Sequence, residues 1–157
     1  MKMNEKEKII HKLYSALQDL DYEGMIKCYH PEATFEDPVF RLGTKNEIAG
    51  MWTMLCKRAK EFELQYYDVR VDGKEGEAQI TAKYLFSQTD RMVHNQISAH
   101  FNFKDGLIIE QVDSFDFWKW SRQALGLTGL LLGWSTFLQN KVRKQADENM
   151  QQFIDAQ

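Results

Sequence analysis

The sequence lacks features that are typical of several common protein classes. Its 157 residues include only two cysteines, Cys28 and Cys56, which are too few to build a fold on disulfides. We interpret them as small buried thiols in a reducing compartment. The only two prolines, Pro31 and Pro38, fall in one short stretch, so no proline-rich linker divides the chain. The longest apolar segment, residues 124–138, is interrupted by Gly, Thr and Ser, which argues against a membrane-spanning helix.

The chain also lacks a surplus of positive charge. It has 20 Lys and Arg against 23 Asp and Glu, a net charge of −3, so we expect no nucleic acid partner. Residues 1–8 are charged and show no apolar leader, and we expect a cytoplasmic protein. The length suits one domain, and the 43% hydrophobic content is that of an ordinary globular chain.

Apolar residues at helical spacing predict three N-terminal helices, around 9–20, 21–29 and 44–55, with Tyr29 in the second. Residues 33–36 form a short extended piece between the last two. Four strand-like stretches follow, at 62–71, 77–88, 93–104 and 107–117, separated by turn residues at 72–73, 89–90 and 105–106. Helices first and an antiparallel meander afterwards predict an α+β domain over residues 1–117, with the helices covering one face of a curved sheet. Residues 118–157 are helical again and form an extension of the same domain.

Two adjacent carboxylates, Glu36 and Asp37, stand between Phe35 and Pro38. Neighbouring side chains of an extended segment face opposite ways, so only one of the two can point inward. A carboxylate in an apolar cavity has a raised pKa and accepts protons near neutral pH. The alternative is that Asp37 and Pro38 simply form a turn.

The stretch from Tyr29 to Pro38, together with Tyr14 on the first helix and the Lys104–Glu110 hairpin, resembles the nuclear transport factor 2-like superfamily. Within it, the chain is similar to the ketosteroid isomerase and SnoaL-like polyketide cyclase branch, over about residues 5–117. The resemblance implies a cone-shaped antiparallel sheet wrapped around the helices, with a deep apolar pocket and no cofactor. It also implies a homodimer formed through the exposed sheet face.

The resemblance further implies that Asp37 is the proton-transferring base and Tyr14 a hydrogen-bond donor to the developing oxyanion. The family's second oxyanion donor, a protonated Asp, aligns with Ala99 here. Loss of one such donor typically costs about 3 kcal/mol of transition-state stabilisation. Isomerisation by an identical mechanism is therefore in question.

Asp113 on the next strand is the candidate substitute. A three-residue hairpin turn at 104–106 would point Asp113 into the cavity beside Ala99, as in the cyclase branch. A two-residue turn would place Glu110, Val112, Ser114 and Asp116 on that face instead. Asp116 is the second candidate, and the alternative for Asp113 is an acid on the strand surface.

The expected cavity lining includes Tyr29, Trp52, Ala99 and Phe115, although such aromatic residues are more often plain core. The four histidines are scattered and predict no metal site. The leading hypothesis is cofactor-free proton transfer next to a carbonyl of an apolar small molecule, giving an isomerised or a cyclised ketone. A second is a non-catalytic module for ligand binding or protein assembly. A third, epoxide hydrolysis, needs an Asp–Arg–Asp set for which no arginine stands out.

The 118–157 extension has three possible placements. It could fold over the open end of the cone as a lid, pack on another subunit, or lie on a membrane surface. Its basic residues Lys141, Arg143 and Lys144 are soon followed by Asp147 and Glu148, so membrane attachment is not expected.

Overall fold

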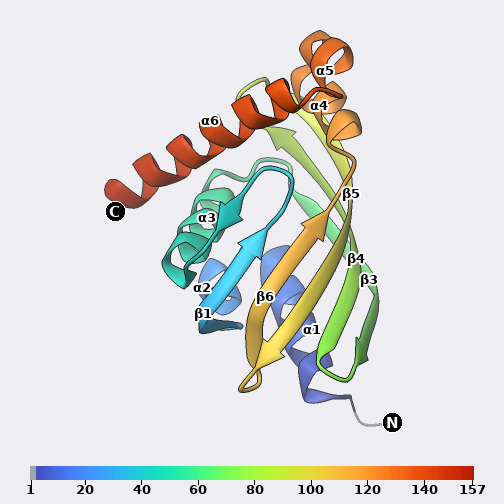
Figure 1. Ribbon diagram of the computed structural model, residues 1–157, viewed down its shortest axis with the longest axis vertical. Coiled ribbons are helices and arrows are strands. Elements are labelled where there is room, and N and C mark those ends of the chain that lie inside the picture. Colours follow the sequence, from blue (N-terminus) through green and yellow to red (C-terminus); the bar gives the residue numbers. More distant parts are fainter. Residues whose placement is uncertain (1–2) are drawn as a thin grey trace.

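The fold is α+β, as the sequence predicts, in a computed structural model that describes residues 3–157. Three helices precede or interrupt the first strands, and three more end the chain (Figure 1). The helices are α1 (Glu5–Gln18), α2 (Tyr22–Ile26), α3 (Lys45–Arg58), α4 (Phe117–Leu125), α5 (Leu127–Leu132) and α6 (Thr136–Asp155). The strands are β1 (Tyr29–Glu36), β2 (Arg41–Leu42), β3 (Glu63–Asp72), β4 (Glu75–Phe86), β5 (Arg91–Lys104) and β6 (Leu107–Ser114).

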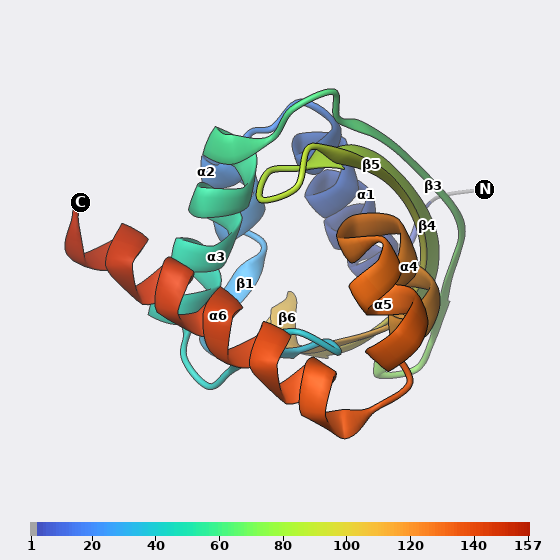
Figure 2. The same cartoon turned by 90° about the horizontal axis from the view of Figure 1, so that it is seen from above.

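The six strands form one mixed sheet in the order β2-β1-β6-β5-β4-β3. All neighbours are antiparallel except β1 and β6, which run parallel. The sheet bends around α1, α2 and α3, so its concave face and these helices enclose the main core (Figure 2). This arrangement is the cone that the resemblance implies.

Polar caps fix where the N-terminal helices begin. The Asn4 side chain accepts from the backbone N–H of Lys6, and the Asp21 side chain accepts from that of Gly24. The Thr44 hydroxyl accepts from the backbone N–H of Glu47 at 3.2 Å, so α3 begins with the cap that the sequence predicts.

Two predicted boundaries are wrong. Helix α2 ends at Ile26 rather than reaching Tyr29, which begins β1 and is fully buried. The last strand ends at Ser114 rather than at residue 117, because Asp116 caps α4 by accepting from the backbone N–H of Lys119 at 3.0 Å. Asp116 therefore serves a helix start and does not line the cavity.

The β5–β6 hairpin follows neither predicted register alone. Its turn has two residues, since Lys104 pairs with Leu107. A bulge at Ile109 then shifts the register, so that Asn102 pairs with Glu110 and Ala99 pairs with Asp113. The extra residue places Asp113 on the cavity face of the sheet, whereas a two-residue turn without the bulge would place it on the opposite face.

The C-terminal helices cover one end of the cone and reach back to α3. Helix α4 is tied to the sheet by the indole N–H of Trp120, which donates to the Tyr84 hydroxyl at 2.8 Å. Helix α6 packs on α3, where Ile154 lies directly over Gly50 and leaves no room for a side chain there. Within residues 3–157, no helix is both long and apolar enough to cross a membrane.

Candidate functional site

A cavity of about 550 Å³ lies between the N-terminal helices, the concave face of the sheet and the C-terminal helices. Its wall is mostly apolar, and its size is that of a pocket for a drug-sized molecule. Five of the residues predicted for the site line it: Tyr14, Asp37, Trp52, Asp113 and Phe115.

Asp37 is held by the turn that follows β1. Its Oδ1 accepts from the backbone N–H groups of Val39 at 2.7 Å and Phe40 at 2.6 Å. The side chain thus forms the turn that the alternative interpretation offered, yet it also lines the cavity. Desolvation raises the pKa of Asp37 to about 6, although the two N–H donors oppose the shift.

The C-terminal helix fixes this turn from outside. Arg143 Nε and Gln139 Nε2, both on α6, donate to the carbonyl oxygen of Pro38 at 2.7 Å and 3.1 Å. The positive charge of Arg143 also lowers the pKa of Asp37, as a smaller effect than desolvation. Helix α6 therefore affects both the position of the Asp37 turn and the pKa of the Asp37 carboxyl group.

Asp113 faces the same cavity from β6. The pKa of Asp113 is raised to about 7, mainly by desolvation and also by the charge of Asp37, while a hydrogen bond from Gln111 lowers it. Two carboxyl groups on one apolar cavity thus have pKa values raised toward neutral pH. Because ionisation of one carboxyl disfavours ionisation of the other, the pair tends to keep one proton.

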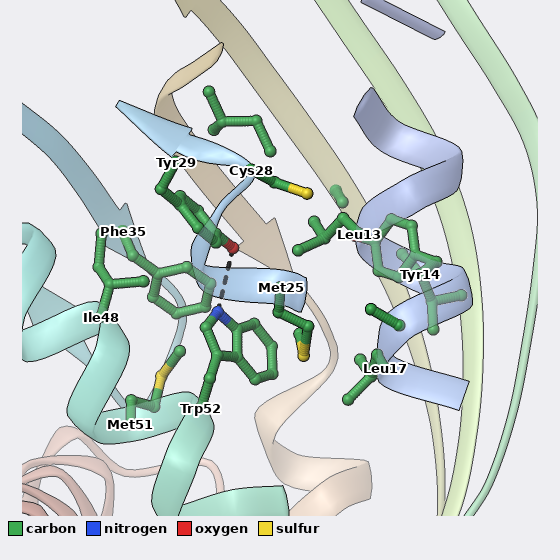
Figure 3. Close-up of a cluster of buried hydrophobic side chains, with 14 of the residues drawn as sticks. Leu13, Tyr14, Leu17, Met25, Cys28, Tyr29, Phe35, Ile48, Met51 and Trp52 are labelled. Carbon is green, nitrogen blue, oxygen red and sulfur yellow. Dashed lines mark hydrogen bonds between the residues drawn. The ribbon is translucent and has the colours of Figure 1, made fainter. Parts of the chain in front are cut away.

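A directed chain of hydrogen bonds ends on Asp113. Trp52 Nε1 donates to the Tyr29 hydroxyl at 3.0 Å, Tyr29 donates to Gln111 Oε1, and Gln111 Nε2 donates to Asp113 Oδ1 at 3.0 Å. Figure 3 shows its first link, the bond between Trp52 on α3 and Tyr29 on β1.

The direction of this chain follows from its first member. An indole N–H can only donate, so the Tyr29 hydroxyl must pass its own proton on to Gln111. The amide oxygen of Gln111 then faces Tyr29, and its NH₂ group faces Asp113. Asp113 Oδ1 is therefore an acceptor, which leaves Oδ2 to carry any proton toward the cavity.

Tyr14 is the third polar group of the site. Its hydroxyl is buried and is the one buried side-chain polar atom without a hydrogen-bond partner in the described part of the chain. Its ring is fixed by stacking on Tyr66, with centroids 5.5 Å apart, and by an edge contact with Phe101. Desolvation raises the pKa of Tyr14, and the charge of Asp113 adds to this effect. Tyr14 is thus a neutral phenol on the wall of the same cavity as Asp37 and Asp113.

Tyr29 and Ala99 do not line the cavity, although the sequence predicts that they do. Both are fully buried and neither is part of the cavity wall, so Tyr29 supports Asp113 from behind. Ala99 pairs directly with Asp113 across the β5–β6 ladder. Asp113 thus lies on the adjacent strand at the same level of the sheet as Ala99.

Sequence reasoning missed two residues of the site and the role of a third. A three-residue turn predicts that Gln111 shares the face of Asp113, but the sequence does not indicate that this fully buried amide links Tyr29 to Asp113. Tyr84 lines the cavity, and the charge of Asp37 contributes to raising its pKa to about 12, although desolvation is the main cause. Arg143 lies 105 residues from Pro38 in sequence, and no local pattern indicates that contact.

Neither a metal site nor the set for epoxide hydrolysis is assembled among the described residues. No group of three His, Cys, Asp or Glu side chains within residues 3–157 is arranged to hold a metal ion. Arg58 lines the cavity, but its guanidinium lies over the Phe153 ring. In residues 3–157, no arginine side chain donates a hydrogen bond to Asp37 or Asp113.

Comparison of folds finds several solved structures that resemble the chain. It resembles an LEH-like epoxide hydrolase from M. tuberculosis, with 21% identity, a TM-score of 0.66 and coverage of 81% of this chain and 95% of that one. It resembles TsrD from Streptomyces laurentii, with 18% identity, a TM-score of 0.68 and coverage of 81% and 99%. It also resembles TerC co-crystallised with polyporic acid, with 15% identity, a TM-score of 0.67 and coverage of 78% and 99%. At these identities the likeness shows the fold alone.

Comparison with family models of protein sequences identifies the family to which the chain belongs. No curated protein matches the chain closely enough to count as a relative. The SnoaL-like domain matches residues 10–111, which include α1 from Ile10 onward, the Asp37 turn and the sheet as far as Gln111. The chain therefore belongs to the family of SnoaL-like domains.

Proposed function

We propose that the protein is a cofactor-free enzyme that moves a proton next to the carbonyl group of an apolar small molecule. One observation carries the proposal: two desolvated carboxyl groups and an unpartnered phenol line the same apolar cavity. A purely structural core would not leave a buried hydroxyl without a partner, because that costs about 1–3 kcal/mol. The cavity is also not filled by Trp52, Phe115 or the C-terminal helices.

The two carboxyl groups take different parts in this reaction. Ionised Asp37 removes a proton from the carbon next to the substrate carbonyl, and the electron pair moves onto the carbonyl oxygen. The hydroxyl of Tyr14 and the protonated carboxyl of Asp113 donate hydrogen bonds to that oxyanion. Both residues line the same cavity, which suits a shared acceptor.

The same enolate supports two outcomes. If Asp37 returns its proton to a more distant carbon of the conjugated system, the product is an isomerised ketone. If the enolate carbon attacks a second carbonyl of the substrate, a ring forms, and the proton of Asp113 passes to the new alkoxide. Both outcomes conserve atoms and electrons without a further reactant.

The test is solvent deuterium exchange and double-bond migration with a panel of cyclic β,γ-unsaturated ketones. We expect the wild type to exchange the proton next to the carbonyl, and Asp37→Asn to lose at least ~100-fold in rate. Tyr14→Phe and Asp113→Asn should each lose ~100-fold or more, since each removes a donor to the oxyanion.

Glu32→Gln is the matched control, because Glu32 lies on the same strand as the residue before Asp37, is exposed and pairs with Lys104 at 3.5 Å. Its rate should equal that of the wild type. If Asp37→Asn exchanges as fast as the wild type, the assignment of the base is wrong. If the wild type binds the ketones without any exchange, the protein is a binding module and the proposed chemistry is wrong.

A further inference from the structure

Most of the exposed large hydrophobic side chains among residues 3–157 lie on α4, α5 and the start of α6. Seven large hydrophobic side chains of this segment are at least 41% exposed, among them Leu127 and Phe137 at 69% and Trp134 at 73%. We call this surface the apolar tip, and it consists of Trp118, Leu127, Leu130, Leu131, Leu132, Trp134 and Phe137. Helices α4 and α5 stand at one end of the molecule, away from the N-terminus (Figure 1).

The last backbone carbonyls of α5 accept hydrogen bonds from within the protein. The carbonyls of Leu130 and Leu131 accept from the indole N–H groups of Trp118 at 3.3 Å and Trp134 at 2.9 Å. The carbonyl of Leu132 accepts from the backbone N–H and the hydroxyl of Ser135. The last carbonyls of a helix normally rely on water, and in an apolar medium they must be satisfied internally. Both exposed indoles also have their single polar group satisfied.

The charge around the apolar tip is mostly positive. Residues 117–146 contain five Lys or Arg and no Asp or Glu, although the whole chain carries a net charge of −3. Arg91, Lys119 and Arg122 line a shallow hollow beside α4 together with one acid, Asp90, and Arg122 also lies over the Trp118 ring at 4.6 Å. On α6, the exposed residues Phe137, Lys141 and Lys144 recur at helical spacing and so share one face.

The acids that follow in sequence offset part of this charge, but only along α6. Asp147 and Glu148 lie three and four residues after Lys144 on the same continuous helix, so they are its neighbours. Phe137 lies ten residues before Asp147, about 15 Å along the helix at 1.5 Å per residue and beyond the ~8 Å screening length at physiological salt. At the start of α6 and on α4, the basic residues Lys119, Arg122 and Lys141 therefore remain.

We propose that the apolar tip docks in the headgroup region of an anionic lipid bilayer. The exposed Leu, Trp and Phe side chains enter the boundary with the acyl chains, and the flanking Lys and Arg side chains contact lipid phosphates. The same segment supplies Leu125, Thr128, Leu138, Lys141 and Val142 to the wall of the cavity. A docked protein thus has its apolar cavity beside the bilayer, where apolar ligands collect. The docking itself does not depend on the chemistry proposed for the cavity.

The test is flotation and tryptophan fluorescence with vesicles of phosphatidylcholine containing about 30% phosphatidylglycerol. We expect the wild type to bind with a blue shift in emission, and to bind pure phosphatidylcholine vesicles at least ~10-fold more weakly. Leu127→Ser/Leu131→Ser should reduce binding to the anionic vesicles ~10-fold or more while the melting temperature is kept, since both side chains are exposed. Lys119→Gln/Lys144→Gln should reduce it ~10-fold.

Two matched double variants control for loss of apolar surface and of charge elsewhere. Met3→Ser/Tyr67→Ser removes exposed apolar side chains outside the tip, and Lys27→Gln/Lys74→Gln removes exposed charges outside it. Both should bind as the wild type does. Failure of the wild type to bind anionic vesicles overturns the proposal, as does unchanged binding by Leu127→Ser/Leu131→Ser. A dimer that forms without lipid and is lost in that variant also overturns it and assigns the surface to a second copy of the chain.

Discussion

At the scale of single residues, the site depends on two carboxyl groups with different surroundings. Two backbone N–H groups hold Asp37, which keeps its pKa at about 6. Asp113 receives one side-chain donor, Gln111, and its pKa is about 7. Two backbone donors and the charge of Arg143 lower the pKa of Asp37, so Asp37 is the group that we assign as the base.

Because the pKa of Asp113 is raised, the free energy of unfolding should depend on pH. Between its unfolded value of about 4 and its folded value of about 7, the folded protein retains a proton that the unfolded chain has released. The free energy of unfolding of the wild type should therefore fall as pH rises through this window, relative to Asp113→Asn, which cannot ionise. We expect the difference to grow by on the order of 2–4 kcal/mol between pH 4 and 7, measured by urea denaturation. Parallel pH curves for the two proteins would show that Asp113 is not desolvated.

At the scale of elements, small departures from regular structure place the functional groups. The bulge at Ile109 turns Asp113 inward, and the cap at Asp116 ends β6 and begins α4. Neither follows from hydrophobic alternation, which marks the strands but not a single extra residue within one. The inward face of Asp113 was therefore predicted through a three-residue turn that the protein does not have.

Helix α5 depends on a close approach of two backbones. A Cβ at Gly129 would overlap the carbonyl of Ser121 on α4, so only glycine fits there. Gly129→Ala should lower the free energy of unfolding by about 1–3 kcal/mol, because backbone must move to admit the methyl group. Gly43→Ala is the control, since a methyl group at residue 43 would have no atom within 4 Å and the φ of Gly43 is not positive. Equal stability of both variants in urea denaturation would mean that α5 does not pack on α4 in solution.

At the scale of the whole molecule, the sequence predicts the class of fold and most element types because their signals are local. Alternation in β5, helical spacing in α1 and the Thr44 cap each lie within a few residues. The site depends instead on contacts between distant segments, such as Trp52 with Tyr29 and Arg143 with Pro38. A resemblance placed Asp37, Tyr14 and Asp113 on one cavity, but only the three-dimensional arrangement shows which groups lie near each other.

The longest of these connections links the C-terminal helix to the acidity of Asp37. Arg143→Met removes both a donor to the Pro38 carbonyl and a positive charge that lowers the pKa of Asp37. The acid limb of the pH profile of kcat/KM should move to higher pH, with a loss of ~3- to 10-fold at pH 6. Gln139→Met removes the other donor to the same carbonyl without changing charge, so it should leave the position of that limb unchanged. If both variants move the limb equally, the position of the turn rather than the charge of Arg143 sets the acidity of Asp37. If neither moves it, α6 supports the cone without acting on the base.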